Sequence, residues 1–140
     1  MNRVTPPMRA MASGLIAHES KRNNGSATRN PLGFHVCEKL RPQLATLMGN
    51  GGFRALVTRA LTLAKEEVPW LRHVHVQSDG SLEVLGEEKA RISKGQIAEG
   101  RVVLLAQVLG LLVAFIGESL TLQLLREVWP KALIKDGFWK

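Results

Sequence analysis

The sequence predicts a mainly α fold: a small helical bundle around one long apolar C-terminal helix, with a short β-hairpin insertion. The first observation is the stretch from Val102 to Gly117, in which Gln107 is the only strongly polar side chain. Apolar residues also recur at helical spacing between residues 40 and 67, and they alternate with polar residues between 74 and 85. A helix that is apolar on all sides has to be covered, so we expect the other elements to pack around it.

The length of the apolar stretch favours a core helix over a membrane anchor. About 16 residues without a charge would form a helix roughly 24 Å long. The hydrocarbon core of a bilayer needs about 20 residues, and Arg101 and Glu118 close this stretch on its two sides. We therefore expect a buried helix, and the alternative is a small membrane-associated protein anchored through residues 102–117.

The formal charge of +7 is concentrated near the N-terminus. Residues 1–30 hold five Lys or Arg side chains and one Glu, which leaves +4 on this segment and +3 on the rest. Large apolar groups are few there, so we predict a disordered basic tail in which only Met8 to Ala17 could form a short helix. The predicted organisation is a tail at 1–30, a helical domain at 31–130 and a C-terminal tail at 131–140.

Two helices are expected before the hairpin. Pro42 either kinks the first helix or lies in its first turn, with the helix proper starting near Arg41. The run from Gly49 to Gly52 is a strong stop signal, because glycine adopts the positive φ angles found at helix ends. A second helix should run from about Gly52 to Glu67 and form a helical hairpin with the first.

The segment after Pro69 predicts the β-hairpin. Val74 and Val76 alternate with polar residues, Leu82 and Val84 do the same, and a Ser-Asp-Gly turn separates the two runs. An isolated two-stranded hairpin is marginally stable in water, so this one should lean on the helices.

The last helix is expected to run from about Gln96 to about Trp129, where Pro130 ends it. A continuous helix of about 32 residues would be close to 48 Å long, which exceeds the breadth of a compact domain of this size. It should therefore protrude, break near Gly110 or Gly117, or pack along a second subunit. We favour the second subunit, because no capping box marks a new helix start after Gly117.

The residue patterns that could support chemistry are incomplete. His73 and His75 would point to one face of a strand and could share a metal ion, but no third ligand is placed by its spacing. Cys37 and His35 are two positions apart, which on a helix separates their side chains. Because no complete catalytic, phosphate-binding or metal-binding motif occurs, we expect a non-enzymatic protein without a cofactor.

The function class that we expect first is a helical protein–protein interaction or oligomerisation module, which associates with itself or with another protein. Small residues four positions apart allow close helix packing, and an amphipathic continuation follows them. The predicted interaction face comprises Ala106, Gly110, Ala114, Leu120, Leu124, Val128 and Trp129. A further alternative is weak nucleic-acid binding through Arg54, Arg59 and Arg72. Residues 31–140 carry a net charge of only +3, however, and lack the high positive charge that is typical of nucleic-acid-binding domains.

A single cysteine and an N-terminus without an uninterrupted apolar segment favour a cytoplasmic location, with inner-membrane association as the alternative. Two segments, GFRALVTRALTLAKEEVPWLRHVHVQSDGSLEVL and VVLLAQVLGLLVAFIGESLTLQLLREVWP, resemble a group of small uncharacterised bacterial proteins. The resemblance covers most of residues 50–130. It implies a bacterial cytosolic context and brings no activity and no site residues with it.

Overall fold

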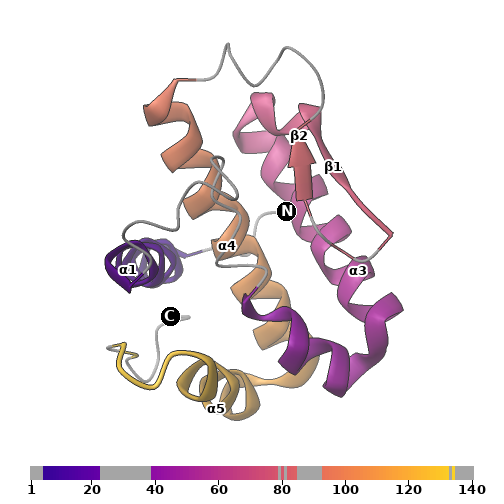
Figure 1. The fold of residues 1–140 in the computed structure, drawn as a ribbon, viewed down its shortest axis with the longest axis vertical. Coiled ribbons are helices and arrows are strands. Elements are labelled where there is room, and N and C mark those ends of the chain that lie inside the picture. Colours follow the sequence, from indigo (N-terminus) through magenta and orange to yellow (C-terminus); the bar gives the residue numbers. More distant parts are fainter. Residues whose placement is uncertain are drawn as a thin grey trace.

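The computed structural model describes residues 5–22, 39–78, 80, 82–84, 93–132 and 134. The elements in this part of the chain are α1 (Pro6–Arg22), α3 (Arg41–Glu67), the 3-10 helix η2 (Pro69–His73), β1 (Val74–Val76), β2 (Leu82–Val84), α4 (Lys94–Ile116) and α5 (Glu118–Val128). The predicted mainly α fold with a short hairpin is confirmed. Helix α4 runs through the middle, α1 and α3 lie on opposite sides of it, and α5 lies across its C-terminal end (Figure 1).

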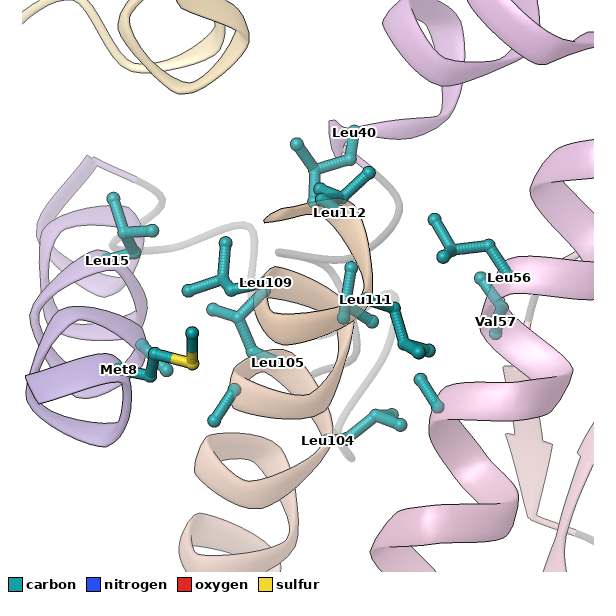
Figure 2. Close-up of a cluster of buried hydrophobic side chains, with 14 of the residues drawn as sticks. Met8, Leu15, Leu40, Leu56, Val57, Leu104, Leu105, Leu109, Leu111 and Leu112 are labelled. Atoms are coloured by element: carbon teal, nitrogen blue, oxygen red, sulfur yellow. The ribbon is translucent and has the colours of Figure 1, made fainter. Parts of the chain in front are cut away.

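Helix α4 forms the centre of the hydrophobic core. Every residue from Val103 to Leu112 is buried, including Gln107. Helix α1 faces one side of α4 with Met8 and Leu15, and α3 faces the other with Leu56 and Val57 (Figure 2). Burying one such large apolar side chain contributes about 1.5–3 kcal/mol, so these two contacts account for much of the stability of the fold.

The start of α4 is fixed by a capping box. The Gln96 backbone N–H donates to Ser93 Oγ at 3.2 Å, and the Ser93 backbone N–H donates to Gln96 Oε1 at 3.0 Å. These two bonds satisfy donors that would otherwise have no partner at a helix N-terminus. The helix therefore begins at Lys94, slightly before the predicted start near Gln96.

The favoured prediction of one continuous helix to about Trp129 is wrong, and the alternative of a break near Gly117 is confirmed. Gly117 has φ 86° and ψ 168°, and it separates α4 from α5. Its carbonyl oxygen accepts from the Thr121 backbone N–H at 3.1 Å and from the Thr121 hydroxyl at 2.7 Å. The bend turns α5 back, so that Leu125 and Trp129 are fully buried in the chain's own core. This internal burial replaces the subunit contact that we expected to cover them.

The prediction of a disordered tail at 1–30 is wrong for Pro6–Arg22, which forms helix α1 and extends the possible short helix at Met8 to Ala17 on both sides. Met8, Met11, Ala12 and Leu15 are buried, and their spacing places them on one helix face. The helix is therefore stabilised by its contact with α4 rather than by local sequence preference. The remainder of that segment, residues 1–4 and 23–30, lies outside the described residues, as does the C-terminal stretch 135–140.

Helix α3 contains the predicted break between two helical segments. Pro42 lies in its first turn, which confirms a start near Arg41. Gly49 has φ 80° and ψ 163°, and helical geometry resumes directly after it. The two predicted helical segments are thus present on either side of a sharp kink at Gly49, and together they carry the label α3 (Figure 1).

The predicted β-hairpin is also confirmed. Strands β1 and β2 pair antiparallel, with Val74 opposite Val84 and Val76 opposite Leu82. Val74 and Leu82 are buried, and Gly80 in the turn lies so close to the Phe53 ring that an added Cβ would be 2.7 Å from it. The hairpin thus leans on α3, as a marginal two-stranded unit must.

Replacing Gly117 with Ala tests the bend. This backbone region is almost exclusive to glycine, so we expect Gly117→Ala to lower the free energy of unfolding by about 1–3 kcal/mol in chemical denaturation. A Cβ at Gly117 meets no heavy atom within 4 Å, so the cost would come from the backbone alone. Gly51→Ala is the matched control, because Gly51 is an exposed helical residue with equally open space, and its unfolding free energy should stay the same or rise. Equal destabilisation by both variants would contradict this account.

Candidate functional site

The elbow between α4 and α5 carries exposed apolar side chains. The side chain of Phe115 is 65% exposed and that of Leu120 is 37% exposed. Ala114, beside Phe115 in the sequence, is exposed as well. We call these three residues the elbow surface. Among the described residues, Leu47 on α3 is the other large hydrophobic residue with comparable exposure.

The elbow surface is exposed because the elements that pack on α4 do not reach its last turn. Burial is complete up to Leu112, while Val113 and Ile116 are half-buried. The space beside Gly117 is open, since an added Cβ would meet no heavy atom within 4 Å. Full burial of a phenylalanine contributes about 1.5–3 kcal/mol, and Phe115, at 65% exposure, gains only part of it.

The predicted interaction face is therefore wrong as a single surface. The structure places five of its seven residues in the core: Ala106, Gly110, Leu124, Val128 and Trp129. Only Ala114 and Leu120 are exposed. Ala106 and Gly110 lie in the buried stretch of α4, and the bend at Gly117 directs most of the apolar face of α5 inward against the rest of the chain.

An ion pair between Arg9 and Glu67 joins α1 to α3. The hydrogen bond to Glu67 raises the pKa of the Arg9 guanidinium above its ordinary value, while partial burial acts in the opposite direction. The two side chains keep 38% and 33% of their surface exposed, so the pair contributes only about 0–1 kcal/mol. On α4, partial burial lowers the pKa of Arg101 from its ordinary value.

Trp70 connects η2 to the first turns of α4. Its indole Nε1–H donates to the backbone carbonyl of Gln96 at 2.9 Å. The indole ring lies over Gly100, where an added Cβ would be 2.5 Å from Trp70 Cζ2. This contact fixes the end of α4 that is remote from the elbow surface, and so it serves the scaffold and not the candidate site.

The three arginines proposed as nucleic-acid contacts are exposed. Arg54 and Arg59 lie on α3, and Arg72 lies on η2, where its Nε donates to His73 Nε2 at 3.4 Å. Five positions on a helix correspond to about 140° of rotation, so Arg54 and Arg59 diverge across the surface of α3. Nucleic-acid binding stays a prediction.

The two histidines considered for a metal ion do not lie on one strand. His73 ends η2, whereas His75 is in the middle of β1, opposite Glu83. Within the ranges that the structure describes, no group of three His, Cys, Asp or Glu side chains could hold a metal ion. His35 and Cys37 lie outside these ranges.

Helix α4 also has the length and composition of a membrane span. The 22 residues from Gly95 to Ile116 are apolar enough to cross a bilayer, although just over half of the most apolar window is buried inside this fold. A buried core helix of a soluble protein has the same properties. The membrane alternative therefore stays a prediction too.

No protein-family model, no curated protein and no solved structure matches this chain. The resemblance to small uncharacterised bacterial proteins accordingly stays a prediction.

Sequence reasoning missed Phe115 as a surface residue. It lies inside the apolar run that ends at Gly117, and nothing local distinguishes it from the buried leucines before it. The available signal was Gly117 itself, since a helix that ends there leaves its last turn at the rim of the bundle. The capping box of Ser93 and Gln96 could likewise have been predicted, because Ser followed three residues later by Gln is typical of a helix N-terminus.

Gly100→Ala tests the contact with Trp70. The new methyl group would force the indole or the backbone to move, so we expect a loss of about 1–3 kcal/mol of unfolding free energy. Gly95→Ala is the matched control on the same helix, because the nearest atom to its added Cβ is Ser93 Oγ at 4.0 Å. Thermal unfolding followed by circular dichroism should give a lower Tm for Gly100→Ala alone. An unchanged Tm in that variant would refute the close contact.

Proposed function

We propose that this chain is a non-enzymatic helical interaction module that acts in the cytoplasm and associates with itself through the elbow surface. The observation that carries the proposal is the 65% exposure of Phe115 at the bend between two core helices. Exposed aromatic side chains beside other apolar groups are typical of protein–protein contacts. Ala114, which precedes Phe115 on α4, and Leu120, in the first turn of α5, are exposed apolar residues on the two sides of the bend.

A second copy of the chain is the partner that fits the elbow surface. In a two-fold contact the same patch meets itself, so a projecting group and a recess must lie close together on one chain. Phe115 projects, Ala114 is small, and the space beside Gly117 is open. In such a contact, Phe115 of one protomer would lie against Ala114 and Gly117 of its partner.

Phe115→Lys tests this proposal. A charge at the centre of the contact would have to be desolvated, and the burial of the phenyl ring would be lost. We expect the Kd for self-association, measured by analytical ultracentrifugation, to rise on the order of tenfold to a hundredfold.

Ala55→Lys is the matched control, since Ala55 is exposed on α3 and the substitution adds the same charge away from the elbow surface. Its self-association should equal that of the unmodified chain. The proposal fails if the unmodified chain is a monomer at all accessible concentrations, or if Ala55→Lys weakens association as much as Phe115→Lys does.

Membrane association through α4 is a second candidate function, favoured by the length and apolar character of Gly95–Ile116. In this case cells that produce the chain should retain it in the membrane fraction after washing at high salt, because apolar contacts resist salt. Recovery of the whole population in the soluble fraction without detergent would exclude this candidate. It would leave self-association through the elbow surface unaffected.

A further inference from the structure

Helices α4 and α5 are separated by the conformation of a single residue, Gly117. The Gly117 backbone N–H donates to the Val113 carbonyl at 3.1 Å, and the Gly117 carbonyl accepts from the Thr121 backbone N–H at 3.1 Å. Both bonds join residues four positions apart, as in an α-helix, so helical bonding reaches Gly117 from either side. Its φ of 86° and ψ of 168° depart from helical values. A change in this one pair of dihedral angles would therefore join α4 and α5 into one straight helix.

The bend also leaves backbone groups on both sides of Gly117 without helical partners. The first N–H groups of α5, on Glu118 to Leu120, and the last carbonyls of α4, on Ala114 to Ile116, have no partner within their own helices. In a straight helix these groups would pair with one another. Most of the residues concerned are exposed, so the straight form would replace bonds to water with backbone bonds.

The apolar face of α5 needs a covering surface in either form of the chain. Leu122, Leu124, Leu125 and Val128 are buried, and Trp129, directly after the helix, is fully buried. Straightening would expose these side chains in an isolated chain, and this loss of burial opposes it. A second copy, however, presents the same surface that covers α5 in the first. Two straightened copies can therefore exchange their α5 helices and restore the burial.

The elbow surface lies at the point where two such copies would meet. In an exchanged pair each chain carries its α5 into the other copy, so the two straight helices pass each other at their hinges. Phe115 and Leu120 flank Gly117 on α4 and α5, and both are exposed in the single chain. Exchange would bring these apolar side chains beside those of the other copy.

We propose that this chain self-associates by exchanging α5 between two copies, with Gly117 as the hinge. The closed form is the bent single chain, and in the exchanged form each copy has a continuous helix from Lys94 to Val128. The core of each copy then contains the α5 of the other and is incomplete without it. The inference rests on the proposed self-association, and it specifies how the two elbow surfaces come together.

Gly117→Ala tests the hinge. Alanine disfavours the bent conformation and is favoured over glycine within a helix, so the variant should shift the chain toward the exchanged form. We expect its dimer Kd, measured by analytical ultracentrifugation, to be on the order of a hundredfold lower than that of the unmodified chain, because both copies contribute a hinge. Gly51→Ala is the matched control, since Gly51 is exposed and already helical, and it should leave the Kd unchanged. A folded Gly117→Ala chain with an unchanged or higher Kd would overturn the proposal.

A distance within one chain distinguishes exchange from a contact between two bent copies, and it requires no change at Gly117. Spin labels at Ala98→Cys on α4 and Glu127→Cys on α5, in a Cys37→Ser background, occupy two exposed positions. The doubly labelled chain is refolded with an excess of unlabelled chain, and monomer and dimer are separated by size and measured by pulsed electron resonance. A straight helix would place the two labelled backbone positions about 44 Å apart, whereas the bend brings them closer together.

The expected result is the long distance in the dimer and a shorter one in the monomer. A dimer that keeps the distance of the monomer would overturn exchange and leave the proposed self-association standing. Absence of any dimer, in the unmodified chain and in Gly117→Ala alike, would overturn both.

Discussion

The need to cover α4 is the constraint on which the rest of the structure depends. Ten consecutive buried residues, from Val103 to Leu112, leave this helix without a polar face to present to water. Helices α1 and α3 cover two sides, and α5 covers the C-terminal end (Figure 1). A helix that is apolar on all sides either lies in a protein core or spans a membrane, and in this fold α4 lies in the core. Each of the other helices therefore shields a different side or end of α4 from water.

The two main departures from sequence-based expectation have the same physical origin. Pro6–Arg22 contains Pro, Gly and few large apolar groups, so its local signal for a helix is weak. It is nevertheless helical, because packing on α4 provides stability that the segment lacks alone. Gly117 likewise permits a bend without requiring one. The chain bends there because folding α5 back buries Leu125 and Trp129, which a straight helix would leave in water.

What could be predicted from sequence were the features fixed by neighbouring residues. The helix start near Arg41, with Pro42 in the first turn, the break at Gly49 and the alternation around the hairpin all depend on local chemistry, and each is found as expected. The candidate site could not be predicted in this way. Phe115 and Leu112 belong to the same apolar run, and only the extent of the surrounding helices makes one exposed and the other buried. An exposed patch is a property of the assembled fold, which single-chain periodicity does not encode.

Trp70 and Gly100 are 30 residues apart in the sequence, and their contact makes the side chain allowed at one position depend on the side chain at the other. The indole occupies the volume that any side chain at Gly100 would need, while its N–H is held by the Gln96 carbonyl. Neither position can therefore vary freely while the other stays fixed. A chain with a larger residue at position 100 would need a smaller one at position 70, and it would then lose the indole bond to α4. In a set of related sequences these two sites should change together, which would identify chains that share this junction even where overall similarity is low.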